Sequence, residues 1–231
     1  MSTDPGRTGK SDDLPSVDRL LTLSDGVVAI ALTLLVLQLR VPALSHVADP
    51  DSASELAAQL GMGGSQLVSY LISFYVIAHF WLIHHRVFRQ LAGQRESLAW
   101  WNFAFLFTIT IMPFTSDLLG EYGNNPLAID IFALNLLLAS MATQATLDLG
   151  RRKGLMAPEA DTGAVRAGLL RAAGATVVIT VSMGLAWVNA DLAKYCWLLL
   201  AVVPRVVNRL PQRQPGRQDD PADRPGGSAG R

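Results

Sequence analysis

Apolar residues fall in six long runs that are separated by short polar or charged segments. Each run approaches the ~20 residues that an α-helix needs to cross the hydrocarbon core of a bilayer. The pattern therefore predicts an all-α integral membrane protein with six membrane-spanning helices in each subunit. The predicted spans are residues 20–39, 66–88, 98–119, 127–147, 172–188 and 192–207, and Pro204 and Arg205 interrupt the last of them.

The two ends of the chain differ in composition from the six runs. Residues 1–16 are polar, and residues 211–231 are rich in Pro, Gly, Arg and Asp. Such segments bury too little apolar surface to fold, so we expect two disordered tails around one six-helix domain at 17–210. The longest connection, 41–64, joins the first two spans. Its centre, 52–60, is expected either to form a short helix or to extend the second span.

The positive charges indicate the orientation. Of the 19 Lys and Arg residues, only Arg40 and Lys194 fall on one side of the predicted spans, and the loops on that side carry acidic residues instead. Positive residues near membrane helices are retained in the cytoplasm. Both termini are therefore predicted to be cytoplasmic.

Composition supports the membrane class and excludes several functions. Hydrophobic residues make up 50% of the chain and charged residues only 16%, whereas soluble domains carry about 25% charged residues. The net charge is zero, which gives no sign of a nucleic-acid partner. The single cysteine, Cys196, excludes an internal disulfide. No phosphate-binding glycine loop or nucleophile elbow is present, so we expect neither an enzyme nor a cofactor.

Several polar side chains lie within the predicted spans, where each is costly unless it has a partner. Asp25 lies near the cytoplasmic end of the first span, Trp81, His84 and His85 near the same end of the second, and Asn102 near that of the third. They are expected to form a hydrogen-bonded network among three helices. The network could be an interhelical clamp, which we favour, or a proton or ion relay. A metal site is disfavoured, because adjacent histidines point about 100° apart on a helix.

The first span also has an apolar side. At 100° per residue, one stripe runs along the helix away from Asp25, with Thr33 at its edge. This stripe is free to face lipid, another helix or a pore axis. Its members are Leu23, Gly26, Ile30, Leu34 and Leu37.

Three short motifs resemble a known family. The first opens the first span with Arg19, three apolar or hydroxyl residues, and then Leu23-Ser24-Asp25. The second is the segment 81–88, Trp-Leu-Ile-His-His-Arg-Val-Phe, and the third combines Asn102 with Pro-Phe-Thr at 113–115. Together they are similar to the transmembrane-protein-175 family, the potassium-permeable channels of endolysosomes and their prokaryotic relatives. Leu23 replaces the usual Phe of the first motif.

The resemblance implies an architecture and a site. Prokaryotic members carry one six-helix unit per chain and assemble as homotetramers, with the first helix lining a central pore. Carried over, the apolar constriction would be Ile30, Leu34 and Leu37, with Thr33 as a possible polar layer. The motif residues that pack the helices together would be Arg19, Ser24, Asp25, Trp81, either His84 or His85, and Asn102.

The function implied is a potassium-permeable channel that favours potassium over sodium modestly. The expected partners are further copies of the chain, the lipid bilayer, and potassium and other monovalent cations as permeant ions. The expected location is the cell membrane of a prokaryote. Two alternatives are a proton channel or pH-gated pathway on the same scaffold and a secondary transporter.

Overall fold

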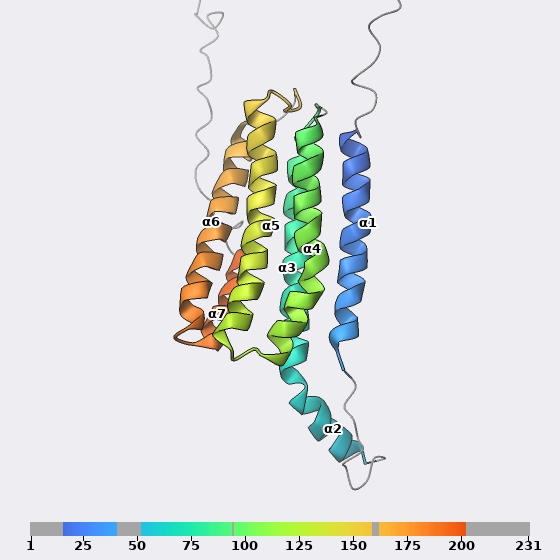
Figure 1. Cartoon of the computed structure of the whole chain (residues 1–231), viewed down its shortest axis with the longest axis vertical. Helices are drawn as coiled ribbons and strands as arrows, with labels where there is room; N and C mark the ends of the chain where they lie inside the picture. Colours follow the sequence, from blue (N-terminus) through green and yellow to red (C-terminus); the bar gives the residue numbers. More distant parts are fainter. Residues whose placement is uncertain (1–15, 41–51, 94, 159–161, 202–231) are drawn as a thin grey trace, which may run out of the picture.

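The computed structural model describes residues 16–40, 52–93, 95–158 and 162–201, and these residues form a helical bundle (Figure 1). The α-helices are α1 (Val17–Leu35), α2 (Ala53–Met62), α3 (Gly64–Phe88), α4 (Glu96–Glu121), α5 (Pro126–Arg152), α6 (Thr162–Ala186) and α7 (Ala190–Cys196). A 3-10 turn, Val36–Gln38, continues α1, and another, Trp197–Ala201, follows α7.

Five of the predicted spans are confirmed as helices long and apolar enough to cross a membrane. These are Val17–Gln38, α3, α4, α5 and the Ala167–Ala186 part of α6. Of the sixth predicted span, 192–207, the described part is helical as far as Ala201, and residues 202–207 lie outside the described residues. The predicted tails also lie outside them, apart from Ser16.

Local sequence signals explain where the helices begin and end. The Ser16 hydroxyl accepts a hydrogen bond from the Arg19 N–H and so caps α1. Asn125 caps α5, and Pro126 occupies its first position, where a missing N–H costs nothing. Gly154, at φ 64°, follows the end of α5 and adopts the left-handed conformation that a glycine tolerates best. α2 meets α3 at Gly63, and Figure 1 shows α2 angled away below the bundle.

The core lies between α3, α4 and α5, and α1 and α6 flank it. Figure 1 shows α1 at one edge of the bundle and α6 with α7 at the other. α4 packs against α5, α3 and α1, whereas α6 packs against α5 and α7. The largest fully buried apolar side chains fill the centre and include Phe105, Ile109, Met112, Phe132 and Leu136.

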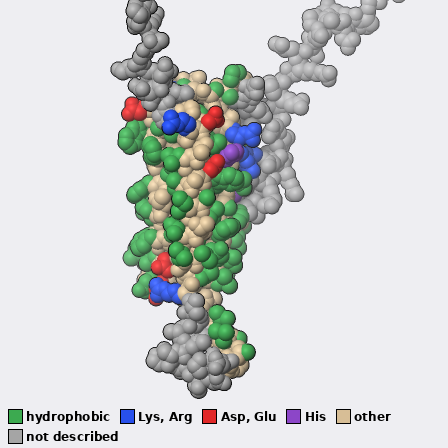
Figure 2. Space-filling view, turned by 90° about the vertical axis from the view of Figure 1, so that its right-hand side faces the viewer, with side chains coloured by type: hydrophobic (Ala, Val, Ile, Leu, Met, Phe, Trp, Pro, Cys, Tyr) green, Lys and Arg blue, Asp and Glu red, His purple; other side chains and the backbone are tan. Residues whose placement is uncertain are grey.

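The two ends of the bundle carry the charges. Figure 2 shows a mainly hydrophobic middle with charged side chains near both ends of the face in view. At one end the α3–α4 and α5–α6 connections pair, because Ala92 N–H donates to the Leu155 carbonyl at 2.9 Å and Ala157 N–H donates to the Gln90 carbonyl at 2.8 Å. At the other end Arg40 lies 3.9 Å from Asp117 and 3.6 Å from Glu121.

Candidate functional site: the polar and apolar sides of α1

The first polar contact of α1 joins it to α3. Asp25 is half-buried, and its Oδ1 accepts a hydrogen bond of 2.7 Å from Trp81 Nε1. The Trp81 ring in turn lies against His85 one turn later, with ring centroids 5.6 Å apart. A hydrogen bond from an indole to a carboxylate is charge-assisted and therefore stronger than a neutral one.

The second polar contact is fully buried and joins three helices. Asn102 Oδ1, on α4, lies 3.0 Å from Ser24 Oγ on α1 and 2.8 Å from His84 Nε2 on α3. The His84 ring stacks on Phe88 and Phe105, with centroid distances of 4.4 and 4.2 Å. The Nε2 edge and the ring faces of the imidazole therefore have partners, whereas its buried Nδ1 has no hydrogen-bond partner among the described residues. His84 lies at the point where α1, α3 and α4 meet.

The hydroxyl of Ser24 has one proton but two acceptors within reach. Its Oγ lies 2.8 Å from the Leu20 carbonyl as well as 3.0 Å from Asn102 Oδ1. Rotating the Asn102 amide by a half-turn would place its NH2, which has no hydrogen-bond partner, toward both Ser24 Oγ and His84 Nε2. In that arrangement the hydroxyl donates to Leu20, and Asn102 donates to both neighbours.

The structure divides the expected network into these two groups. Asp25 and Trp81 form one, with His85 against the indole, and Ser24, His84 and Asn102 form the other. His84 is thus the histidine that hydrogen-bonds across helices. Arg19 lies exposed at the start of α1, where its backbone N–H donates to the Ser16 hydroxyl. Among the described residues, its side chain makes no hydrogen bond to either group.

The opposite side of α1 is uncovered. Ile30 is 61% exposed, Leu34 43% and Leu37 74%. The side facing α3 and α4 is buried instead, at residues spaced three or four apart: Leu20, Ser24, Val28, Ala31 and Leu35. Thr33 is exposed, and its hydroxyl donates to the Ile30 carbonyl at 2.7 Å, so the polar atom is directed back along the helix.

Sequence reasoning missed a group of serines between α3 and α4. Ser69 Oγ donates to the Ser116 carbonyl at 2.7 Å, and Ser73 Oγ donates to Ser116 Oγ at the same distance. It also missed Gln38, whose Nε2 donates to the Pro113 carbonyl. The four-residue spacing of Ser69 and Ser73 on one helical face was the available signal.

Within the described residues, no group of three or more His, Cys, Asp or Glu side chains could hold a metal ion. The two polar groups join α1 to α3 and α4 through hydrogen bonds. In each group a polar side chain of α1 has a partner on another helix, which the bilayer would not provide.

Comparison with known proteins gives consistent matches. The family described as "Endosomal/lysosomal potassium channel TMEM175" matches residues 19–113. A potassium channel of Streptomyces collinus is 32% identical over 189 residues, which cover 80% of this chain and 89% of that protein. The human "Endosomal/lysosomal proton channel TMEM175" is 26% identical over 132 residues, which cover 56% of this chain and 25% of that protein.

A solved structure has the same fold. The crystal structure of a lysosomal potassium-selective channel TMEM175 homologue from Chamaesiphon minutus aligns with a TM-score of 0.69 and 25% sequence identity. The alignment covers 83% of this chain and 98% of that one. The matched range 19–113 contains the polar and apolar residues of α1 described above, together with Trp81, His84 and Asn102.

Removing the Asp25 carboxylate should loosen α1. Asp25→Ala leaves the Trp81 N–H without its acceptor, which we expect to cost about 1–3 kcal/mol and to lower both the thermal midpoint and the yield of assembled protein in detergent. Asp130→Ala is the matched control, because Asp130 accepts from Trp187 at 3.0 Å but joins α5 to the end of α6. Equal losses in the two variants would contradict a special role for the α1 contact.

Proposed function

The chain belongs to the TMEM175 family of ion channels, and from this membership we propose that it is a potassium-permeable channel formed by four copies around a pore lined by α1. Because the family consists of ion channels, the chain is also a multi-pass membrane protein and not an enzyme. The membrane is proposed to be the cell membrane of a prokaryote, with both termini in the cytoplasm.

The observation that carries the proposal is the two-sided character of α1. One side is buried through Ser24, Val28 and Ala31, and the other leaves Ile30, Leu34 and Leu37 exposed. An uncovered apolar stripe on a membrane helix can face lipid or a neighbouring subunit. Membership of a channel family favours a pore, because these are the positions to which the family's constriction carries over.

The geometry of one chain also favours an assembly. Phe105, Ile109 and Phe132 are fully buried at the centre of the single bundle, which disfavours an ion pathway through the middle of one subunit. α1 lies at the edge of the bundle (Figure 1), so a pathway lined by α1 has to be enclosed by further copies. One chain supplies one residue to each layer, and a closed ring requires cyclic symmetry.

The proposed constriction acts through hydration. A ring of Ile30, Leu34 or Leu37 side chains offers no oxygen to replace the water around an ion, so the barrier is set by dewetting and by partial dehydration. Potassium holds its water less tightly than sodium and crosses such a ring more easily. Selectivity is modest because no carbonyl cage takes part. The Thr33 hydroxyl, bonded to the Ile30 carbonyl, adds little to ion coordination in this rotamer.

The polar side of α1 is proposed to act as the clamp that sets the stripe's direction. Asp25 and Ser24 attach α1 to α3 and α4 through hydrogen bonds of 2.7 and 3.0 Å. A helix held at these two points, 100° apart around its axis, has a fixed rotation. The constriction residues then point away from α3 and α4, toward the side of α1 on which the central pore axis would lie.

A polar residue in the constriction should weaken the barrier. In Ile30→Asn channels reconstituted in planar bilayers, we expect a higher conductance and nearly equal potassium and sodium permeability, because the amide provides ligands for dehydrated ions. Val177→Asn on α6 is the matched control, since Val177 is also 61% exposed but should face lipid. Unchanged conductance and selectivity in Ile30→Asn would refute the pore assignment.

A second candidate is proton conduction on the same scaffold. It is favoured by the similarity to the human endosomal/lysosomal proton channel. It is also favoured by the His85 imidazole, whose Nδ1 is buried without a hydrogen-bond partner among the described residues beside the Trp81–Asp25 pair. His79 is a further titratable group on α3, and the centroid of its ring lies 6.0 Å from that of Tyr75.

Reversal potentials separate the two candidates. For a potassium channel in liposome-derived bilayers, we expect a shift approaching ~59 mV for a tenfold potassium gradient and little shift when only the pH differs. A proton channel gives the opposite pattern, with a shift per pH unit of the same size. His85→Ala should leave the potassium reversal potential unchanged, whereas loss of the pH-driven shift in that variant would favour the proton pathway.

The orientation can be tested with single cysteines. In a Cys196→Ser background, Asn124→Cys lies between α4 and α5 and Lys153→Cys at the far end of α5, and both sites are exposed. We expect a membrane-impermeant maleimide to label Asn124→Cys in intact cells and Lys153→Cys only after permeabilisation. The reverse pattern would place the termini outside.

A further inference from the structure

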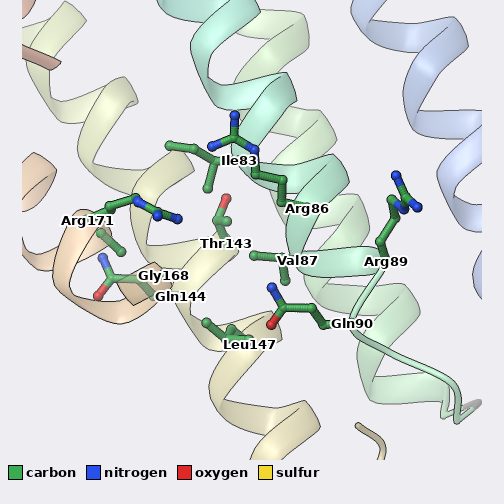
Figure 3. Close-up of a pocket in the computed structure, with 11 residues that line it drawn as sticks. Ile83, Arg86, Val87, Arg89, Gln90, Thr143, Gln144, Leu147, Gly168 and Arg171 are labelled. Carbon is green, nitrogen blue, oxygen red and sulfur yellow. The ribbon is translucent and has the colours of Figure 1, made fainter. Parts of the chain in front are cut away.

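A cavity of about 340 Å³ lies between α3, α5 and α6, at the end of the bundle where α3 and α5 finish (Figure 3). It is separate from the polar and apolar sides of α1, because α1 lies at the opposite edge of the bundle (Figure 1). The same end carries the paired connections of Ala92 with Leu155 and Ala157 with Gln90. None of the residues assigned to the channel pathway lines it.

The cavity has an apolar part and a positive part. Ile83, Val87 and Leu147 provide apolar surface, and Arg86, Arg89 and Arg171 provide positive charge. Figure 3 shows Arg86 from α3 and Arg171 from α6 reaching toward the space around Thr143, whereas Arg89 points away. Of the described residues that line the cavity, none is acidic.

The two arginines are like charges on helices that α5 separates. Arg86 on α3 and Arg171 on α6 both line the cavity, and α3 and α6 each pack against α5. Both guanidinium groups border one cavity, so a phosphate between them could accept hydrogen bonds from each. Arginine matches phosphate geometry especially well, because its planar fork donates two parallel hydrogen bonds.

The depth of the cavity points to a lipid as the source of that anion. Arg86 lies two residues before the end of α3, and Arg171 lies in the first part of the Ala167–Ala186 span. Both therefore lie where a membrane helix passes from the hydrocarbon core to the headgroup region. Basic pockets between membrane helices at this level bind anionic headgroups. The apolar walls would contribute nothing to a free phosphate ion but would accept the upper part of an acyl chain.

We propose that this cavity binds one anionic phospholipid, with its phosphate between Arg86 and Arg171 and its chain against Ile83, Val87 and Leu147. Gln90 and Gln144 border the same space and can donate side-chain N–H groups to headgroup oxygens. A bound lipid would join α3 to α6 across α5. This inference does not depend on the proposed pore, because it concerns the edge of the bundle opposite α1.

Lipid binding to the purified full-length protein tests the proposal. In native mass spectrometry and thermal unfolding, phosphatidylglycerol should be retained and should raise the thermal midpoint, whereas phosphatidylcholine with the same chains should do neither. Arg86→Gln and Arg171→Gln should each weaken phosphatidylglycerol binding roughly fivefold. Arg151→Gln is the matched control, because Arg151 is an exposed arginine in the last turn of α5 that does not line the cavity.

A second variant tests the space rather than the charge. A Cβ at Gly168 makes ordinary contact at 3.6 Å with Leu147 Cδ2, so Gly168→Leu should fold, fill the apolar part and abolish phosphatidylglycerol retention with every arginine in place. Three outcomes would each overturn the proposal: equal retention of the two lipids, an equal loss in Arg151→Gln, or unchanged binding in Gly168→Leu. Millimolar inorganic phosphate should not raise the midpoint, and an equal rise would assign the site to free phosphate instead.

Discussion

A polar side chain at membrane depth needs a partner within the protein, and this requirement determines how α1 sits on the rest of the bundle. Lipid offers no hydrogen bonds, so the Asp25 carboxylate needs a donor on another helix. Ser24 can donate to the Leu20 carbonyl of α1 and also lies against a polar group of another helix. Trp81 on α3 and Asn102 on α4 provide these two groups. Once these contacts are made, the rotation of α1 follows, and with it the side on which Ile30 and Leu37 remain uncovered.

Much of this arrangement could be predicted from the sequence because its causes are local. The apolar runs set the positions of the spans, and the depth of Asp25 and Trp81 from helix ends on the same side predicted that they would lie close together. The two sides of α1 follow from helical periodicity alone. The family resemblance was needed only to turn an uncovered stripe into a candidate pore, since periodicity does not tell a lipid-facing stripe from a pore-facing one.

Other features depend on tertiary geometry that the sequence does not display. His84 and His85 are adjacent, and only the rotation of α3 against α4 decides that His84 meets Asn102 while His85 lies against Trp81. The cavity between α3, α5 and α6 is lined by residues more than eighty positions apart, from Arg86 to Arg171. No local sequence pattern connects them. The described part of the sixth predicted span changes to a 3-10 turn at Trp197. There the Trp197 ring packs against Phe132, and the Trp197 side-chain N–H donates to the Ser182 hydroxyl.

The contacts of α1 are unevenly distributed along its length. Directional polar bonds hold it near Ser24 and Asp25, and again beyond its last turn, where Gln38 meets the Pro113 carbonyl and Arg40 lies near Asp117 and Glu121. Between these anchors, Val28 and Ala31 touch the bundle through apolar surface alone, which has no preferred direction. Because hydrogen bonds hold α1 only near its two ends, its middle is the part that contacts with α3 and α4 restrain least. The segment around Ile30 is therefore where α1 can bend away from the bundle without breaking a hydrogen bond to another helix.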